Sequence, residues 1–170
     1  FLSTAIAVGD KGTLLAPESS NPLVEGEVLN AILASGEEIS VTVSKKNIYI
    51  GVDTLVIKDS KDFGKVSPLV LSSFSGLKLG SNIVSFGGKD SDNVVSTGII
   101  SQFENSGTDN ATSTAKNIGV TNIILSNPIL GWLLLDTSGN TVGFVIPSAT
   151  PESAKYIDAA VLHKLLGQTI

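Results

Sequence analysis

The 170-residue chain contains no cysteine, no methionine and no arginine, and two of these absences exclude classes of function. Without cysteine there is no disulfide, no thiolate metal site and no thiol nucleophile. Without arginine the chain lacks the forked donor that suits phosphates and base edges. Its eleven lysines are outnumbered by sixteen acidic residues, which gives a net charge of -5. Nucleic-acid binding usually needs a basic face, so we expect no nucleic-acid partner.

Long apolar runs are also lacking. No stretch reaches the roughly 20 residues that a membrane-spanning helix needs, so we expect no membrane insertion within this segment. Because Phe1 is not an initiator methionine, we expect a mature or excised domain that a signal peptide or membrane anchor could precede. Together with the missing cysteine, this predicts a bacterial, extracytoplasmic protein, periplasmic or at the cell surface, with a tether in the preceding segment.

Metal and phosphate sites are not supported either. Asp90 and Asp92 suggest calcium, but the pattern of oxygen ligands in a calcium loop is not completed. Residues 87–89 read Gly-Gly-Lys without the spacing of a phosphate-binding loop. The single histidine, His163, lies in an apparently helical stretch, where we expect a surface or partly packed side chain. We therefore expect no metal and no cofactor.

Short apolar segments separated by turn residues are what the sequence has in abundance. Residues 38–43 alternate polar and apolar, which is the period of a half-buried strand. Such segments at close spacing, without a helical period between them, favour a barrel or a sandwich. The expected strands are 4–8, 13–15, 30–34, 38–43, 47–50, 54–57, 68–71, 82–87, 94–103, 122–125, 131–135 and 141–146.

The C-terminal end changes its period. A helix is predicted to start at Pro151 and Glu152 and to end at Gly167. Its apolar side chains, on or near one face, are Tyr156, Ala160, Leu162, Leu165 and Leu166. Residues 72–80 are predicted to cross between two halves of one domain, and the polar residues 104–117 to form an exposed loop.

Several segments resemble, in order along the chain, the trypsin-like domain of HtrA/DegP-type serine proteases. The resemblance covers nearly the whole chain and implies an all-β fold. It predicts two six-stranded antiparallel barrels, at about residues 1–72 and 81–170, with a C-terminal helix. The matching segments are 4–15 (the first hairpin), 77–87 (L-x-V-G-x-x-V-x-A-I-G), 96–101 (T-x-G-I-V-S), 134–143 (L-L-N-x-x-G-x-V-I-G) and 145–148 (A-I-P-S).

The catalytic serine of this family has no counterpart here. The family uses a Ser nucleophile, a His base and an Asp that orients the His, and its Ser sits in G-N-S-G-G-P-L-L. In the matching run, residues 128–135, Leu130 falls on the Ser and Trp132 on the second Gly. A leucine side chain has no nucleophilic atom, so no acyl-enzyme can form there. We expect a reshaped oxyanion loop.

The other two catalytic positions are also degenerate. A gapless match of the family's T-N-x-H-V-V puts Ser19 on the His, whereas a match on V-E-G puts Pro22 there. Neither can act as a base near neutral pH. The family's D-L-A-L-L-K fits at Asp53 with a short insertion, or at Gly51 without one. The resemblance thus implies an inactive homologue of a serine protease.

We expect such a domain to bind a peptide or protein by strand addition along residues 140–145. One alternative is a structural spacer in an exported or envelope-anchored protein, with Trp132 and Leu133 closing the cleft. Others are an unrelated β-domain with chance likenesses, and residual hydrolysis through Ser126 or Thr121. The residues expected to line the binding cleft are Gly131, Trp132, Asn140, Thr141, Val142 and Gly143.

Overall fold

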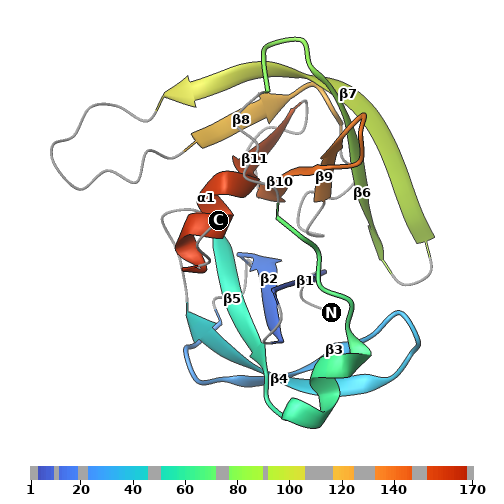
Figure 1. Ribbon diagram of the computed structural model, residues 1–170, viewed down its shortest axis with the longest axis vertical. Helices are drawn as coiled ribbons and strands as arrows, with labels where there is room; N and C mark the ends of the chain where they lie inside the picture. Colours follow the sequence, from blue (N-terminus) through green and yellow to red (C-terminus); the bar gives the residue numbers. More distant parts are fainter. Residues whose placement is uncertain are drawn as a thin grey trace, which may run out of the picture.

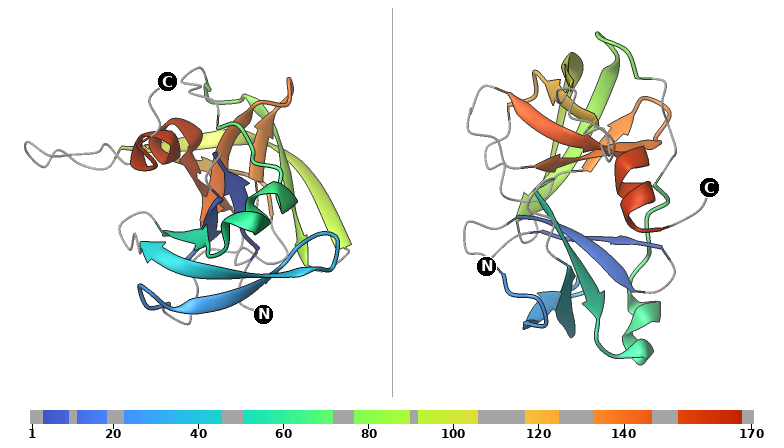
Figure 2. Two further views of the ribbon diagram at one scale, coloured as in Figure 1. Left: turned by 60° about the horizontal axis from the view of Figure 1, so that its bottom comes forward. Right: turned by 90° about the vertical axis from the view of Figure 1, so that its left-hand side faces the viewer.

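A computed structural model of the chain describes residues 4–9, 12–18, 23–45, 51–71, 77–89, 92–105, 117–124, 133–146 and 153–167. Its strands form two β-structures, one from each half of the chain, stacked along the long axis of the molecule (Figure 1). A short helix lies beside the junction of the two halves (Figure 2).

The first half is an open antiparallel sheet with the order β1-β2-β5-β4-β3. Its strands are β1 (Ile6–Val8), β2 (Thr13–Pro17), β3 (Val28–Ile32), β4 (Glu38–Lys45) and β5 (Val52–Ile57). The alternation expected in β4 is confirmed, because Ile39, Val41 and Val43 are buried and their neighbours are not. The prediction of a six-stranded first barrel is corrected to an open five-stranded sheet. In the described residues β1 and β3 are its edge strands and do not pair with each other. The strand expected at 47–50 falls outside these residues.

The second half is the closed barrel that the sequence predicted, in the order β10-β11-β8-β7-β6-β9. Each of its six strands is hydrogen-bonded to a neighbour on both sides, so the ring has no open edge. The strands are β6 (Asn82–Lys89), β7 (Asp92–Asn105), β8 (Asn117–Thr121), β9 (Leu133–Asp136), β10 (Thr141–Ile146) and β11 (Ala154–Asp158).

The helix predicted from residue 151 is wrong in its first part. Residues 154–158 form β11, which pairs with β8 and β10, and α1 begins only at Ala159 and ends at Leu165. Barrel closure explains the difference, since β11 supplies the ladder that joins β8 to β10. Asp158 caps the helix by accepting a hydrogen bond from the Ala160 N–H at 2.8 Å. The predicted stop at Gly167 is confirmed by its φ of 66°.

Other elements differ locally from the prediction. The segment 68–71 is not a strand; it makes single parallel bridges from Leu69 to Val8 and from Leu71 to Thr141. The strand expected at 122–125 is wrong: β8 lies earlier and ends at Thr121, and residues 122–124 are not in a strand. A 3₁₀ helix, η1 (Ser60–Lys65), was not predicted at all.

Three apolar clusters hold the structure together. The inter-half cluster joins the two halves into one packed unit, since it draws on the open sheet, the barrel and α1. Its buried members are Val8, Leu15, Val52, Leu71, Phe144, Ile146, Ile157, Val161 and Leu162. The sheet core comprises Leu14, Ala16, Leu23, Ile39, Val41, Val43, Leu55 and Ile57. The barrel core comprises Ile83, Ile100, Ile123, Leu134, Val142, Val145, Ala154 and Tyr156.

Tyr156 is the largest side chain of the barrel core and requires two glycines beside it. Its side chain is 1% exposed and lies over Gly119 of β8 and Gly143 of β10. A Cβ atom at either glycine would overlap the tyrosine ring. The hydroxyl has no hydrogen-bond partner among the described residues, and burial raises the pKa of Tyr156. The aromatic ring of Tyr156 therefore contributes to the core by packing, whereas its hydroxyl makes no hydrogen bond to the described residues.

Gly119→Ala and Gly143→Ala should each lower the free energy of unfolding by about 1–3 kcal/mol, because the added methyl group forces the ring or the strand to move. Urea denaturation measures the loss. Gly64→Ala in η1 is the control, since nothing lies within 4 Å of its Cβ position. Tyr156→Phe should cost no stability, because it removes an unpartnered hydroxyl. An unchanged urea midpoint for Gly119→Ala would contradict this packing.

Asp158 should make stability decrease as the pH rises. Desolvation raises its pKa in the folded state, although the Ala160 N–H partly opposes this. The folded state thus prefers the protonated carboxyl. Its stabilisation is complete below the unfolded pKa of about 3.9 and is lost as the pH rises through the folded pKa.

Asp158→Asn keeps a good N-cap without the charge, so it should be at least as stable as the wild type at pH 7 and flatten the dependence above pH 4. Asp158→Ala should lose about 0.5–2 kcal/mol at pH 7. Unfolding free energies from pH 3 to 7 are the measurement. A large loss in Asp158→Asn at pH 7 would show that the charge itself stabilises the fold.

Candidate functional site

The structure places some of the candidate residues and leaves others out. The described residues include Asp53, Gly51, His163 and the segment 140–143. The remaining candidates lie outside the described residues: Ser19, Pro22, Leu130, Gly131 and Trp132.

Asp53 lies on β5, opposite Ala16 of β2, and is 1% exposed. Strand alternation puts it on the same face as Leu55 and Ile57, which belong to the sheet core. Leu23, which directly follows Pro22 in the sequence, belongs to the same cluster. A carboxyl group is therefore enclosed by the first half.

Gly51, the alternative position for the Asp, is a turn residue. Its φ is 70°, a conformation that an aspartate adopts only with strain. Its carbonyl oxygen accepts a hydrogen bond from the Glu18 N–H at 2.9 Å. An ideal Cβ there would lie 3.6 Å from Cβ of Ile146, at the end of β10. Of the two positions, only Asp53 presents a carboxyl group.

His163 is in the last turn of α1 and partly exposed. Within the described ranges, no hydrogen bond or ion pair joins its imidazole to a serine, a threonine or a carboxylate. Lys164, its neighbour, places a cationic side chain in the last turn, which suits the helix dipole. The structure thus gives His163 the surroundings of a helix-end residue, and not those of a general base.

Asn140 is fully used by the turn between β9 and β10. Its side-chain amide donates to Asp136 Oδ2 at 2.8 Å, and its backbone N–H donates to Asp136 Oδ1 at 2.8 Å. The Ser138 N–H also donates to Oδ1, at 2.9 Å. These bonds, that of the Asn140 side chain above all, lower the pKa of Asp136. The hairpin predicted at 138–140 is confirmed, with Asn140 acting within the turn.

Thr141, Val142 and Gly143 are buried in β10. β10 pairs with β9 along one side and with β11 along the other, and Gly143 and Phe144 take part in both registers. Leu71 makes a further bridge to Thr141. A partner strand therefore cannot pair at Gly143 and Phe144, whereas strand addition along the rest of residues 140–145 stays a prediction.

The β6–β7 hairpin carries an exposed apolar surface that was not predicted from the sequence. Phe86 is 43% exposed and its cross-strand neighbour Val95 is 54% exposed. Ile83 and Ser85, which point to the opposite face, are buried in the barrel. We call the outward-facing apolar residues the β6–β7 surface: Val84, Phe86, Val95 and Ile99. The polar residues Asn82 and Thr97 face the same side. The hairpin is long and runs down one side of the molecule (Figures 1 and 2).

The sequence held a signal for this surface. In residues 83–86 (Ile-Val-Ser-Phe) apolar residues occupy both strand faces, whereas a strand with one solvated face alternates apolar and polar residues. The second apolar face was therefore visible before the structure, but the sequence did not show whether other elements would cover it.

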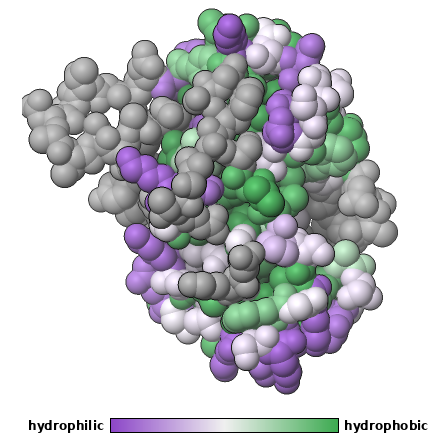
Figure 3. Space-filling model, in the orientation of Figure 1, coloured by the Kyte–Doolittle hydropathy of each residue, from purple (hydrophilic) through white to green (hydrophobic). Residues whose placement is uncertain are grey.

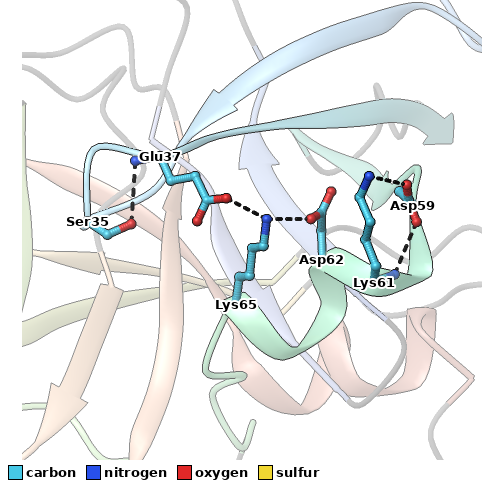
Figure 4. A network of polar contacts seen from close by, with 6 residues as sticks. All are labelled: Ser35, Glu37, Asp59, Lys61, Asp62 and Lys65. Carbon is cyan, nitrogen blue, oxygen red and sulfur yellow. Dashed lines mark hydrogen bonds and ion pairs between the residues drawn. The ribbon is translucent and has the colours of Figure 1, made fainter.

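A polar network ties η1 to the turn before β4 (Figure 4). The Lys65 ammonium forms ion pairs with Glu37 and with Asp62, the latter at 2.7 Å, and both raise the pKa of Lys65. Lys61 pairs with Asp59 at 2.9 Å. Hydrophilic residues accordingly dominate this end of the molecule (Figure 3). A shallow open depression lies beside the network, lined by residues 38–40 and 58–62. Its open shape suits a solvated surface better than a substrate site.

The part of the chain that the structure describes lacks both a metal-ligand cluster and a membrane-spanning helix. It contains no group of three histidine, cysteine, aspartate or glutamate side chains that could hold a metal ion. It also contains no helix with the length and apolarity to cross a membrane.

Comparisons with known proteins agree with the fold. No family model and no curated protein matches the sequence. Among solved structures, the chain is similar to the apo protease domain of MamO from Magnetospirillum magneticum, with a TM-score of 0.69 and 16% identity over 96% of this chain and 87% of that one. The fold is therefore trypsin-like, with one closed barrel and one open sheet. At this identity the likeness shows the fold alone.

The Asp136 turn gives a test by acid titration. A folded pKa below the unfolded value means that the turn's stabilisation is present above about pH 3.9 and is lost as the pH falls through the folded pKa. In two-dimensional NMR, the amide signals of Ser138 and Asn140 should move with a midpoint below about 3.9. Asn140→Ala should raise that midpoint. A midpoint at or above 3.9 in the wild type would show that these bonds do not hold the carboxylate.

Proposed function

We propose that this chain is a catalytically inactive trypsin-like domain that acts as a protein-binding or scaffolding module. The sequence supports inactivity, since Leu130 matches the nucleophile position and neither Ser19 nor Pro22 can replace an imidazole base. Asp53 then has no histidine of a triad to orient. A buried carboxyl group without a serine nucleophile and an imidazole base cannot carry out the acyl transfer of this family.

The packing between the halves favours a rigid platform. The inter-half cluster joins buried apolar side chains of both halves, among them Val52 of β5 and Ile146 at the end of β10.

The observation that carries the binding role is the β6–β7 surface. Phe86 and Val95 expose apolar side chains side by side, and none of the four residues of the surface is charged. Exposed apolar groups gathered on one face mark protein contacts more often than isolated ones do. Aromatic residues, phenylalanine among them, are enriched in such contacts. We therefore assign this surface to a peptide or protein partner.

The second candidate is a structural spacer in an exported or envelope-anchored protein, which the inter-half packing would equally suit. Residual hydrolysis has less support. Thr121 is buried, and its hydroxyl oxygen accepts a hydrogen bond from the Ile123 N–H at 3.1 Å, so it is shielded from a substrate. Ser126 lies outside the described residues.

Inactivity predicts no covalent labelling by a serine-directed fluorophosphonate and no cleavage of unfolded casein. Trypsin at the same concentration is the positive control. Labelling of the wild type that mass spectrometry assigns to one serine would overturn this proposal.

The binding role predicts that an immobilised peptide array will contain binders and that Phe86→Ser/Val95→Thr will weaken them at least about tenfold. Val70→Thr is the matched control, because Val70 is exposed but lies outside the β6–β7 surface. Thermal unfolding should confirm that both variants remain folded. No binder above background would favour the spacer, and equal losses in both variants would place the contact elsewhere.

A further inference from the structure

β7 is longer than the ring that it helps to close. The strand has 14 residues, but only residues 100–105 pair with β8. Residues 92–98 pair with β6 alone, so the other side of their backbone has no strand beside it in the described part of the chain. Figure 1 shows β7 running well past β8. The first part of β7 is therefore an edge strand among the described residues.

A single asparagine ends the pairing of β7 with the chain that follows β8. The Ile99 N–H donates to Asn122 Oδ1 at 2.8 Å, and the Asn122 N–H donates to the Ile99 carbonyl oxygen at 3.3 Å. The chain then turns inward, because Ile123 belongs to the barrel core. A Cβ atom at Gly98 would overlap both Asn122 and Ile123. Gly98 thus lets the chain leave the edge of β7 at this point.

The direction of the backbone groups along this edge follows from the bonds at its end. Ile99 directs its N–H and C=O groups away from β6, whereas the Ile100 N–H donates at 3.0 Å to the residue before β6. Since the two directions alternate along an antiparallel strand, Asn93, Val95 and Thr97 also direct these groups away from β6. No described residue forms a backbone hydrogen bond with them on that side.

No charge or proline protects this edge against pairing. Natural edge strands are usually protected by charges, prolines or bulges. Residues 93–98 contain no charged residue and no proline, and the irregularity in β7 lies later, between Ile100 and Gln102. Val95 and Thr97, two of the three outward-bonding residues, have the β-branched side chains that favour strands. Such an edge is suited to accept an added strand.

The side chains beside the edge indicate an apolar partner. Val95 is 54% exposed and lies opposite Phe86. Val94, whose side chain points to the other face of the hairpin, is 39% exposed and lies opposite Gly87. A strand added here would place one side chain in line with Val95 and the next in line with Val94. Two successive apolar residues would therefore bury apolar surface on both faces.

The length of the edge favours a peptide over a second copy of this chain. A stable interface between folded proteins usually includes about 20–30 residues a side, whereas this edge comprises residues 93–97. Two copies would also bring together chains that each have a net charge of -5. A peptide that adds as a strand draws its affinity from backbone hydrogen bonds and needs only a short edge.

We propose that the edge of β7 at residues 93–97 binds an extended peptide with adjacent apolar residues at its centre, which adds as a strand beside β7 in line with β8. The three outward-bonding residues hold its backbone, and Phe86, Val94 and Val95 contact its apolar side chains. This inference rests on the proposed binding function and specifies how the partner is held.

Hydrogen exchange tests the binding mode with the probe peptide Lys-Thr-Thr-Val-Ile-Val-Thr-Thr-Lys and with the binders from the array. At saturating peptide, the amides of Asn93, Val95 and Thr97 should exchange at least about tenfold more slowly. Val94 and Ser96, whose amides face β6, are internal references. The probe with N-methyl groups on its central residues keeps its side chains but lacks backbone donors, so it should give no protection.

Thr97→Pro supplies a second test, because it removes an outward N–H that β6 does not use. It should weaken peptide binding at least about tenfold, and more than Thr97→Ala does, since alanine retains the N–H. Thermal unfolding should confirm that both variants remain folded. Equal binding by Thr97→Pro and Thr97→Ala would overturn the strand addition.

The outcomes separate this inference from the proposed function. Peptides that bind without slowing exchange at residues 93–97 would overturn the strand addition but leave the binding role intact. Failure of the probe and of every array peptide to bind would overturn both. Protection that rises with protein concentration in the absence of peptide, together with a dimer in sedimentation, would assign the edge to a second copy and overturn the inference.

Discussion

Closure of the second barrel is the constraint on which most of this structure depends. Once six strands form a ring, each backbone edge is used, and every segment within the ring must be a strand whatever its local preference. This makes β11 a strand although its sequence continues into a helix. It also fixes Tyr156 over two glycines, and it pairs Gly143 and Phe144 of β10 on both edges. The first half lacks this closure in the described residues, and there an open edge and a partly covered core occur together.

The trypsin-like fold could be predicted because its signals are local or ordered along the chain. Alternation in β4 and the Ser-Gly turn before β10 follow directly from short-range rules. The start of α1 could not be predicted, because Tyr156 and Ala160 fit a helical face as well as they fit a strand followed by a helix. Only long-range pairing with β8 and β10 decides between these readings. The same holds for β8, whose register depends on β7 and β11.

The candidate site was harder to predict than the fold. Sequence comparison matched the family's Asp position to Asp53 or to Gly51. The structure shows Asp53 buried on β5 and Gly51 in a turn with a φ of 70°. Asn140 was expected to line a cleft, but its amide is directed to Asp136. Exposure of Phe86 and Val95 depends on what the rest of the chain leaves uncovered, which no local pattern encodes.

The central claim is that this fold persists here without acyl-transfer chemistry. The most direct measurement is mass spectrometry of a diverse peptide library after prolonged incubation with micromolar protein. The account predicts the same peptide spectrum as in a sample without protein. Cleavage at defined positions that disappears in the variant Ser126→Ala would contradict it, because the chain would then possess a working nucleophile.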